Sequence, residues 1–478
     1  MIHPRPTGLR RRAAACLALV LLSGCSFIGG DVPLPPRAPR AGTESRGDRD
    51  HAQLVAAFGG EVRAPAVQRL LTDVTNRLVA ASDRPDESYR VTVLNSPVVN
   101  AFALPTGRLY VTRGLLALAN DMAELAAVLS HEIAHVTLRH ASLRNELEAR
   151  SALITQVTQN VLNNPTEAAV VRDRSRFTLA SFSRSQELDA DQAGVKVLAR
   201  AGFDPFGAPR FLTALDKAGG GTDRNRPTLS DMLSTHPSTA ERISLAVRAA
   251  RRESAPGIGE GDRGSYLAAL EGLAYGDDPS DGLIRGRRFV HGRLGIAFEA
   301  PEGMSLENTA EAVLGSSRDG SRRLLFDAAT TPSGQSLEEV LRTTWNDTIE
   351  PGSLEASTVN GLPVATAQSR GKEWWFRLSA IRIGGTTFRL IVATRAGSGD
   401  LEGMFRRTLE SVRQVTPAEA RSLTPLRLRI VAAQAGDTAE DFAARMAVDR
   451  GFERFLLLNG LDRGGPLVAG ERYKLVVE

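Results

Sequence analysis

His131 and His135 stand four residues apart in the segment HEIAH. On an α-helix, residues i and i+4 project from the same face, so the two imidazoles can converge on one metal ion. Glu132 lies beside that face, where its carboxylate can reach a water on the metal. The flanking pattern is helical from Asn120 through His140, with Asn120 as the expected N-cap. The segment therefore predicts a helix that carries part of a metal site.

A hydrolytic zinc site also needs a third protein ligand while one position stays open for water. The best candidate is Glu187 in the segment ELDAD, on a helix predicted to cover Ser183–Arg200. Glu187 and Asp191 share one face of that helix, so one can bind the metal while the other orients a ligating histidine. Asp189 falls on the far side and is not expected to be a ligand.

Several motifs together resemble those of the HtpX/BepA-type gluzincin peptidases, a family that also includes the CAAX prenyl endopeptidases. In chain order they are NAFALPTGRLYVTRGLL, HEIAH, SRSQELDADQAG, AGFDP and THPS, within residues 50–250. The family usually has glutamate at position 189, where this chain has aspartate, and that position is not a ligand. The resemblance implies a mainly helical zincin catalytic domain with a small edge-stranded sheet, and zinc-dependent hydrolysis of peptide bonds.

Carried onto this sequence, the resemblance implies one zinc ion per chain, bound by His131, His135 and Glu187. It makes Glu132 the general base that takes a proton from the attacking water and later hands it to the leaving amine. Asp191 then orients a ligating histidine.

Two more histidines need a role. The family counterpart of His236 lies over the metal, where it either donates to the tetrahedral oxyanion or fills the open coordination position at rest. The alternative is a loop histidine that only packs. His140 lacks the spacing of a third metal ligand and is expected to be structural. A helix is expected after Ser238, which has capping-box spacing to Glu241.

The segment Gly107–Thr112 is expected to form the edge strand along the cleft. An extended substrate can add to such an edge through backbone hydrogen bonds, which give affinity with little sequence preference. Unfolded polypeptides are therefore the expected substrates.

Residues 1–24 resemble an export signal. Arg5 and Arg10–Arg12 are followed by an apolar run, Ala13–Leu22, which is too short to span a bilayer. The run ends in LSGC, which resembles the lipobox of bacterial lipoproteins and implies acylation of Cys25. The alternative is a signal peptide that is cut elsewhere. Ser26 favours the outer membrane, so we expect a lipid-anchored protein on the periplasmic side.

This leader also explains the charge of the chain. The formal net charge is +4, and the leader holds four arginines and no acidic residue, so the remainder carries 4 − 4 = 0. A nucleic-acid partner is not expected for such a chain. The one other cysteine, Cys16, lies in the leader, so no disulfide framework is expected.

The 478 residues suit an α+β chain of about three domains. Residues 25–50, rich in proline, glycine and charge, predict a flexible tether. The metal motifs fall in 51–252, and 253–287 predict a linker with a short helix. Residues 288–415 predict an α+β domain of unknown role, with a hairpin turn at Gly384-Gly385.

Residues 424–478 resemble a LysM module, a small βααβ domain that binds the N-acetylglucosamine chains of peptidoglycan. The resemblance rests on AGDT at 435–438, NGL at 459–461 and GERY at 470–473. A structural module of similar spacing is the alternative.

Three functions are compatible with this reading. The leading one is an endopeptidase that removes unfolded or misassembled envelope proteins, with the C-terminal modules locating it near the cell wall. The second is a latent protease that acts mainly as a chaperone or assembly factor and is held shut by His236. The third is a peptidoglycan-binding protein in which the zinc domain is auxiliary.

Overall fold

The computed structural model describes residues 46–141, 183–219, 236, 239–308, 312–329, 334–345 and 349–478. The predicted leader, Cys25 and most of the tether lie outside these residues. The chain divides into two units at Arg46, and the second unit, Gly47–Glu478, is compact. Within the described ranges, no helix combines the length and the apolar character needed to cross a membrane.

Helix α1 (Arg46–Ala57) begins inside the range predicted to be a tether. Two side-chain contacts hold it. Arg108 Nη2 donates to Asp48 Oδ1 at 2.7 Å, and His51 Nδ1 lies 2.9 Å from the hydroxyl of Tyr110. The tether prediction is therefore wrong for residues 46–50, because local composition does not reveal partners that lie about 60 residues away.

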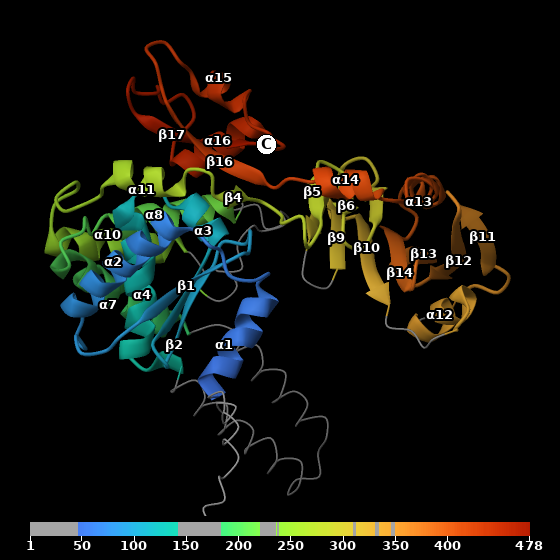
Figure 1. Ribbon diagram of the computed structural model, residues 1–478, viewed down its shortest axis with the longest axis horizontal. Helices are drawn as coiled ribbons and strands as arrows, with labels where there is room; N and C mark the ends of the chain where they lie inside the picture. Colours follow the sequence, from blue (N-terminus) through green and yellow to red (C-terminus); the bar gives the residue numbers. More distant parts are fainter. Residues whose placement is uncertain are drawn as a thin grey trace, which may run out of the picture. The chain divides into compact units, whose positions relative to one another are not determined.

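One buried helix, α4 (Met122–Thr137), stands at the centre of the first part of the second unit. All its residues from Met122 to His135 are buried, so α4 is enclosed on every side and not only along one apolar face. Helix α3 (Arg113–Leu118) precedes it. Around α4 lie α2 (Pro65–Ala81), α7 (Arg184–Arg200) and α8 (Gly207–Ala218), with α10 (Ala240–Glu253) packed on α7 and α8 (Figure 1).

A three-stranded sheet lies beside α4. Strand β3 (Arg108–Thr112) pairs in parallel with β1 (Arg90–Leu94) on one side and antiparallel with β2 (Ala101–Leu104) on the other. The prediction that Gly107–Thr112 is the edge strand is therefore wrong, because β3 is central and β2 is the outer strand that contacts α4. Alternation along one strand indicates which residues face inward, but it does not indicate how many neighbours the strand has.

Residues 283–414 form a second α+β body with its own core. Its hairpin at Gly384-Gly385 is confirmed, since Ile383 pairs with Thr386 across the turn. A seven-stranded antiparallel sheet carries α12 (Leu337–Thr344) on one face and α13 (Leu401–Glu410) on the other. In spatial order the strands are β11 (Glu355–Val359), β12 (Leu362–Arg370), β13 (Trp374–Ile383), β14 (Thr386–Arg395), β10 (Arg322–Ala329), β9 (Ala312–Ser317) and β8 (Met304–Asn308). A smaller sheet has the order β15 (Arg413–Gln414), β7 (Ile296–Glu299), β6 (Arg288–His291), β5 (Leu283–Arg285).

The C-terminal segment has the order strand, helix, helix, strand. Its elements are β16 (Leu426–Ala432), α15 (Ala439–Ala443), α16 (Gly451–Asn459) and β17 (Arg472–Val477). Strand β16 pairs with β17 and also with β4 (Ala274–Tyr275), which follows helix α11 (Arg263–Leu270). The C-terminal sheet is thus completed by a strand from residues that precede the second body.

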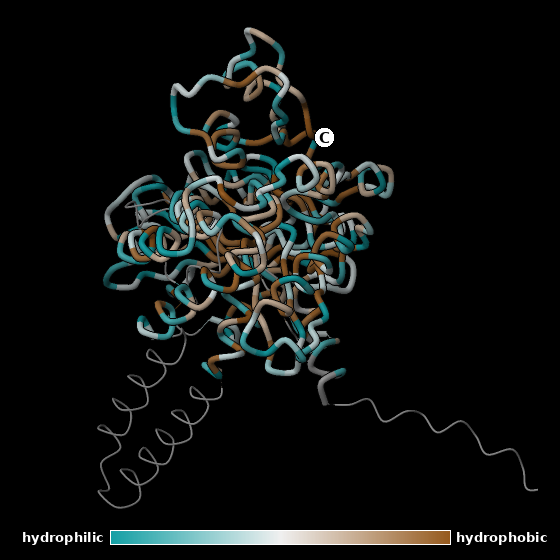
Figure 2. The backbone as a smooth tube through the Cα atoms, turned by 90° about the vertical axis from the view of Figure 1, so that its left-hand side faces the viewer, coloured by the Kyte–Doolittle hydropathy of each residue, from teal (hydrophilic) through white to brown (hydrophobic). Residues whose placement is uncertain are grey.

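Buried side chains also join this segment to the helices around α4. The fully buried Lys474 donates from Nζ to the carbonyls of Ala117, in the last turn of α3, and Ala119, just past its end. Leu428 and Val476 belong to the same apolar cluster as the core of α4. Figure 2 shows the hydrophobic stretches of the chain gathered inside the body. The C-terminal segment therefore shares a core with the helices of the first part.

Candidate metal centre

Helix α4 places the two histidines of HEIAH side by side. Its N-cap is Asp121, whose side chain accepts from the backbone N–H of Glu124 at 2.8 Å. The predicted cap, Asn120, was one residue too early. The helix continues without interruption through His131 and His135, so the two imidazoles share one face, with their Nε2 atoms 3.0 Å apart.

Helix α7 brings Glu187 and Asp191 against α4. The predicted start is confirmed, because Ser183 caps α7 in a capping box with Gln186. Gly194 allows close packing, since a Cβ at this position would lie 3.1 Å from the backbone nitrogen of His131. Close helix packing at Gly194 therefore helps to set the distance between the histidines of α4 and the carboxylates of α7.

Four buried side chains meet there, namely His131, His135, Glu187 and His236, and one donor atom from each lies within 4.8 Å of the other three. His131 Nε2 is 3.5 Å from Glu187 Oε2 and 3.3 Å from His236 Nδ1. Glu187 Oε1 is 3.4 Å from His135 Nε2 and 2.9 Å from His236 Nδ1. The structure thus brings together all three predicted ligands, and His236 with them.

These distances suit a tetrahedral zinc ion. Bonds of 2.0–2.1 Å place neighbouring ligand atoms about 3.3 Å apart in a tetrahedron, and the distances above run from 2.9 to 3.5 Å. Glu132 Oε1 is buried and accepts no aligned hydrogen bond from the described residues. A buried carboxylate oxygen without a donor is costly unless a cation or a water satisfies it. The residues therefore fit a bound metal.

Comparison with known proteins agrees with this geometry. The model of peptidase family M48 matches residues 65–250, which include every residue of the cluster. These residues are an M48 peptidase domain.

Relatives of the M48 domain are proteases by name. The mitochondrial metalloendopeptidase OMA1 of Arabidopsis thaliana is 38% identical over 169 residues, 35% of this chain and 33% of that protein. The beta-barrel assembly-enhancing proteases of Yersinia pestis and Escherichia coli K12 are 32% and 30% identical, covering 38% and 44% of each chain. The chain thus spans about a third to under a half of the length of these relatives. A solved structure from Bacteroides thetaiotaomicron aligns over 34% of this chain and 59% of its own with a TM-score of 0.23 and 9% identity, too distant to inform the site.

Zinc is the metal of this family, and the M48 domain holds donors for one ion. Burial lowers the pKa of His131, but its contacts with Asp191 and Glu187 outweigh burial and raise it to about 10. Burial raises the pKa of Glu187, yet its contacts with three histidines hold it well below the ordinary value. The cluster therefore favours a positive charge, which a divalent cation can supply in place of the proton on His131.

His135, the second histidine of α4, is suited to donate a lone pair to a metal ion. Burial lowers the pKa of His135 to about 3, so its imidazole stays neutral near neutral pH. His140, predicted to be structural, lies with its Nδ1 2.9 Å from Nδ1 of His135. That prediction missed a contact, because α4 ends at Thr137 and a left-handed turn at Arg139 (φ 57°) folds His140 back onto the ligand face.

Asp191, predicted to orient a ligating histidine, has Oδ1 3.0 Å from His131 Nδ1. Sequence reasoning missed its second partner, Arg242, whose buried guanidinium contacts both Asp191 and Glu187. Arg242 lies on α10, which begins after the N-cap Thr239, one residue later than the predicted cap Ser238. No motif marks an arginine at this position, so only the fold could reveal it.

Glu132 lies beside the metal cluster. Its Oε1 lies 3.7 Å from His236 Nε2, and it also interacts with the backbone N–H of Ala103 in β2. Burial raises its pKa, although the neighbouring histidines oppose that effect. A raised pKa makes a carboxylate a better proton acceptor, which suits a general base.

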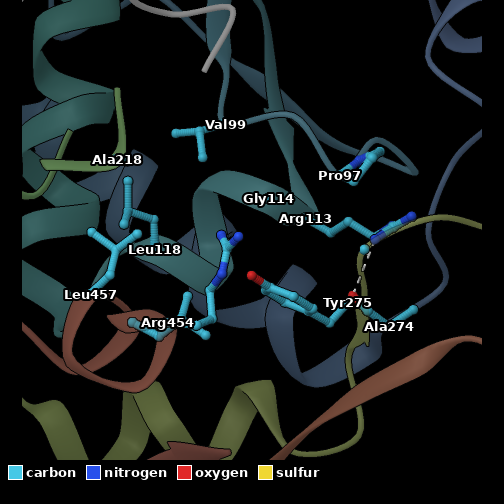
Figure 3. A pocket seen from close by; sticks show the side chains of 12 residues that line it. Pro97, Val99, Arg113, Gly114, Leu118, Ala218, Ala274, Tyr275, Arg454 and Leu457 are labelled. Atoms are coloured by element: carbon cyan, nitrogen blue, oxygen red, sulfur yellow. Dashed lines mark hydrogen bonds between the residues drawn. The ribbon is translucent and has the colours of Figure 1, made fainter. Parts of the chain in front are cut away.

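A pocket of about 500 Å³, including its open mouth, borders the site at His135. It is also lined by Arg84, Pro105 and Arg139, so it lies beside the turn between β2 and β3. Figure 3 shows another pocket, lined among others by Tyr275 and Arg454. None of the four cluster residues lines that second pocket, so the pocket at His135 is the one that adjoins the chemistry.

Proposed function

We propose that this protein is a zinc-dependent endopeptidase that hydrolyses peptide bonds of unfolded or misassembled cell-envelope proteins. One observation carries the proposal: the buried carboxylate of Glu132 lies beside a buried metal-binding cluster, with Oε1 3.7 Å from His236 Nε2. The match to M48 proteases supports it.

His131, His135 and Glu187 hold the zinc ion in this proposal. Zinc, when bound, supplies Lewis-acid chemistry and makes water acidic enough to ionise near neutral pH. Asp191 keeps a proton on Nδ1 of His131, which leaves Nε2 of that ring free for the metal.

Glu132 is the general base. Its Oε1 lies 3.7 Å from His236 Nε2 and accepts no aligned hydrogen bond within the described part of the chain. Burial raises the pKa of Glu132, so the carboxylate can remove a proton from the attacking water. The protonated carboxyl then gives that proton to the nitrogen of the leaving amine, which prevents the peptide bond from re-forming.

Strand β2 is the proposed binding edge for substrate. It is the outer strand of its sheet and contacts α4, and Ala103 in it touches Glu132. An extended polypeptide paired with β2 passes beside the catalytic carboxylate. Backbone pairing requires an unfolded segment but little sequence, which fits misassembled proteins as substrates.

His236 favours a latent resting state. Its Nδ1 is a fourth donor of the cluster, and a site with four protein donors keeps no position open for water. We infer that His236 leaves the cluster when the enzyme is active. This observation supports a second candidate function, a latent protease that acts mainly as an envelope chaperone or assembly factor.

Location is also part of the proposal. Two of the relatives named above are beta-barrel assembly-enhancing proteases, which supports an envelope role for this chain. A lipid on Cys25 would hold the protein on the periplasmic side of the outer membrane. The strand-helix-helix-strand order of 424–478 supports a LysM-like module that contacts peptidoglycan.

The test is degradation of casein by the chain that starts after Cys25, with zinc content measured on each protein. Glu132→Gln should keep zinc and lose cleavage, while Glu187→Gln should lose both. Asp189→Asn is the matched control, because Asp189 is an exposed carboxylate on the same helix and should change neither. Cleavage by Glu132→Gln at the wild-type rate would refute the assignment of the base.

Latency is tested with His236→Ala. If His236 closes the site, this variant should bind zinc and cleave casein faster than the wild type. If it binds zinc and is slower, His236 serves the reaction itself, and the latent-protease candidate is wrong.

A further inference from the structure

Arg242 has no part in the reaction as proposed, yet it is among the most buried charged residues of the M48 domain. Its side chain is 4% exposed, and it lies on α10, opposite the two carboxylates of α7. Burying a guanidinium is costly unless it is paired. The partners of the Arg242 guanidinium therefore indicate its role.

One guanidinium holds both carboxylates. Nε donates to Asp191 Oδ2 and Nη2 donates to Asp191 Oδ1, each at 2.7 Å. The third nitrogen, Nη1, lies 2.8 Å from Glu187 Oε2. Like charges four residues apart on a helix repel each other, and burial strengthens that repulsion. Arg242 offsets it and fixes the directions of both side chains, because its planar fork has a rigid geometry.

The contacts extend to a second metal ligand. Asp191 Oδ1, which accepts from Arg242, lies 3.0 Å from His131 Nδ1. An acceptor at Nδ1 selects the tautomer that carries its proton there, so Nε2 presents a lone pair to the cluster. Arg242 thus acts on Glu187 directly and on His131 through Asp191.

We propose that Arg242 is a positioning residue that sets the zinc affinity of the site by holding Glu187 and the Asp191–His131 pair in ligand geometry. The inference rests on the proposed zinc site. It assigns Arg242 no contact with substrate or with the reacting atoms.

The packing of α10 on α7 does not depend on Arg242 alone. Val195 of α7 shares a buried apolar cluster with Ala249 and Ala250 of α10, and Arg184 and Glu241 pair across the same two helices at the surface. Substitution of Arg242 should therefore leave the helices packed while it frees the two carboxylates.

The experiment measures the zinc dissociation constant by competition with a chromophoric chelator at pH 7.5. Arg242→Lys keeps the positive charge but loses the planar guanidinium, and Arg242→Gln loses both. We expect affinity to fall about 10-fold in the first and between about 10-fold and 100-fold in the second. Arg248→Lys is the matched control, because Arg248 is an exposed arginine on the same helix whose Nη1 donates to Ser244. Its affinity should stay within about twofold of wild type.

A second readout separates positioning from general support of the fold. Long-range ¹⁵N–¹H spectra of the zinc-loaded protein, in which zinc takes the place of one ring proton, report which nitrogen of His131 carries the remaining proton. We expect a single tautomer in the wild type and in Arg248→Lys, and a mixture in Arg242→Gln. Far-UV circular dichroism establishes that each variant is folded.

Wild-type zinc affinity in a folded Arg242→Gln overturns the proposal. If neither variant at Arg242 folds, the side chain serves the fold, and the proposal is likewise wrong. Zinc binding is measured without substrate, so its outcome is independent of proteolysis. A protein that loses zinc affinity in Arg242→Gln but never cleaves casein would keep this inference and lose the proposed function.

Discussion

Gly207 is the first residue of α8, and it lies against Ala123 in the first turn of α4. A Cβ at this position would lie 2.4 Å from the carbonyl oxygen of Ala123 and 2.5 Å from its carbonyl carbon. Ordinary contacts begin near 3.4 Å, so Gly207→Ala is about 1 Å too close to a backbone that cannot rotate away. Helix α8 must then move off α4.

The expected cost follows from this overlap. Overpacking a core costs about 1–3 kcal/mol, and a clash with backbone belongs at the upper end. Alanine recovers roughly 0.5–1 kcal/mol through its better helix propensity. The net loss is about 2–3 kcal/mol, or roughly 5–10 °C in Tm for a domain of about 200 residues.

A second glycine provides the control. Gly264 also lies in the first turn of a helix, α11, but the nearest atom to its added Cβ is 3.7 Å away. Gly264→Ala should be neutral or stabilise by up to about 1 kcal/mol. The same chemical change thus has opposite expected signs at two helix starts.

Two spectroscopic probes distinguish the unfolding of the M48 domain from that of the second body. Helical circular dichroism at 222 nm follows the M48 domain, which holds the long helices. Tryptophan fluorescence follows the second body, because all three tryptophans, Trp345, Trp374 and Trp375, lie there. Gly207→Ala should lower the Tm of the transition followed at 222 nm and leave the Tm of the tryptophan transition unchanged. If the Tm of the 222 nm transition stays within about 1 °C of the wild-type value, α8 adapts without cost and the packing argument is refuted.

Three further predictions concern metal, pH and the C-terminal segment. Removing zinc with a chelator should lower the Tm of the helical transition but not that of the tryptophan transition, because the ligands Glu187 and His131 join α7 to α4; equal shifts of both would contradict a local site. Burial raises the pKa of Asp277 from 3.8 to about 6, so the native state holds this proton more tightly and stability falls as pH rises from about 4 through 6. Asp277→Asn should therefore stabilise by up to roughly 3 kcal/mol at pH 7.5 and little at pH 4, and equal Tm differences at both pH values would contradict this. Deleting residues 424–478 should unfold the M48 domain, because it removes Leu426, Leu428, Leu458 and Val476 from the shared core and exposes the apolar surface they cover. The lost burial is at most roughly 6–12 kcal/mol, against a typical stability of about 5–15 kcal/mol. Cooperative unfolding with full zinc content in the truncated chain would show that the segment is dispensable, and would make it usable in a peptidoglycan pull-down.

The sequence by itself determined the local half of the site. His131 with His135, and Glu187 with Asp191, are pairs four residues apart, and any helix puts such pairs on one face. Helix α7 could be delimited for the same reason, since Ser183 and Gln186 interact within one turn. The hairpin at Gly384-Gly385 also depends on adjacent residues alone.

Only the tertiary structure determined which side chains from elsewhere in the chain contact α4 and α7. His236 joins the cluster across 105 residues from His131, and Arg242 reaches Asp191 across 51. The position of His236 over the metal was expected only from the family resemblance. Arg242 carries no local pattern, because an arginine has the same sequence signature whether it is solvated or buried between two carboxylates. The edge position of β2 and the place of Lys474 in the core likewise depend on partners elsewhere in the chain. Spacing along a helix is set by backbone geometry, whereas contacts between elements are set by which buried surfaces fit one another.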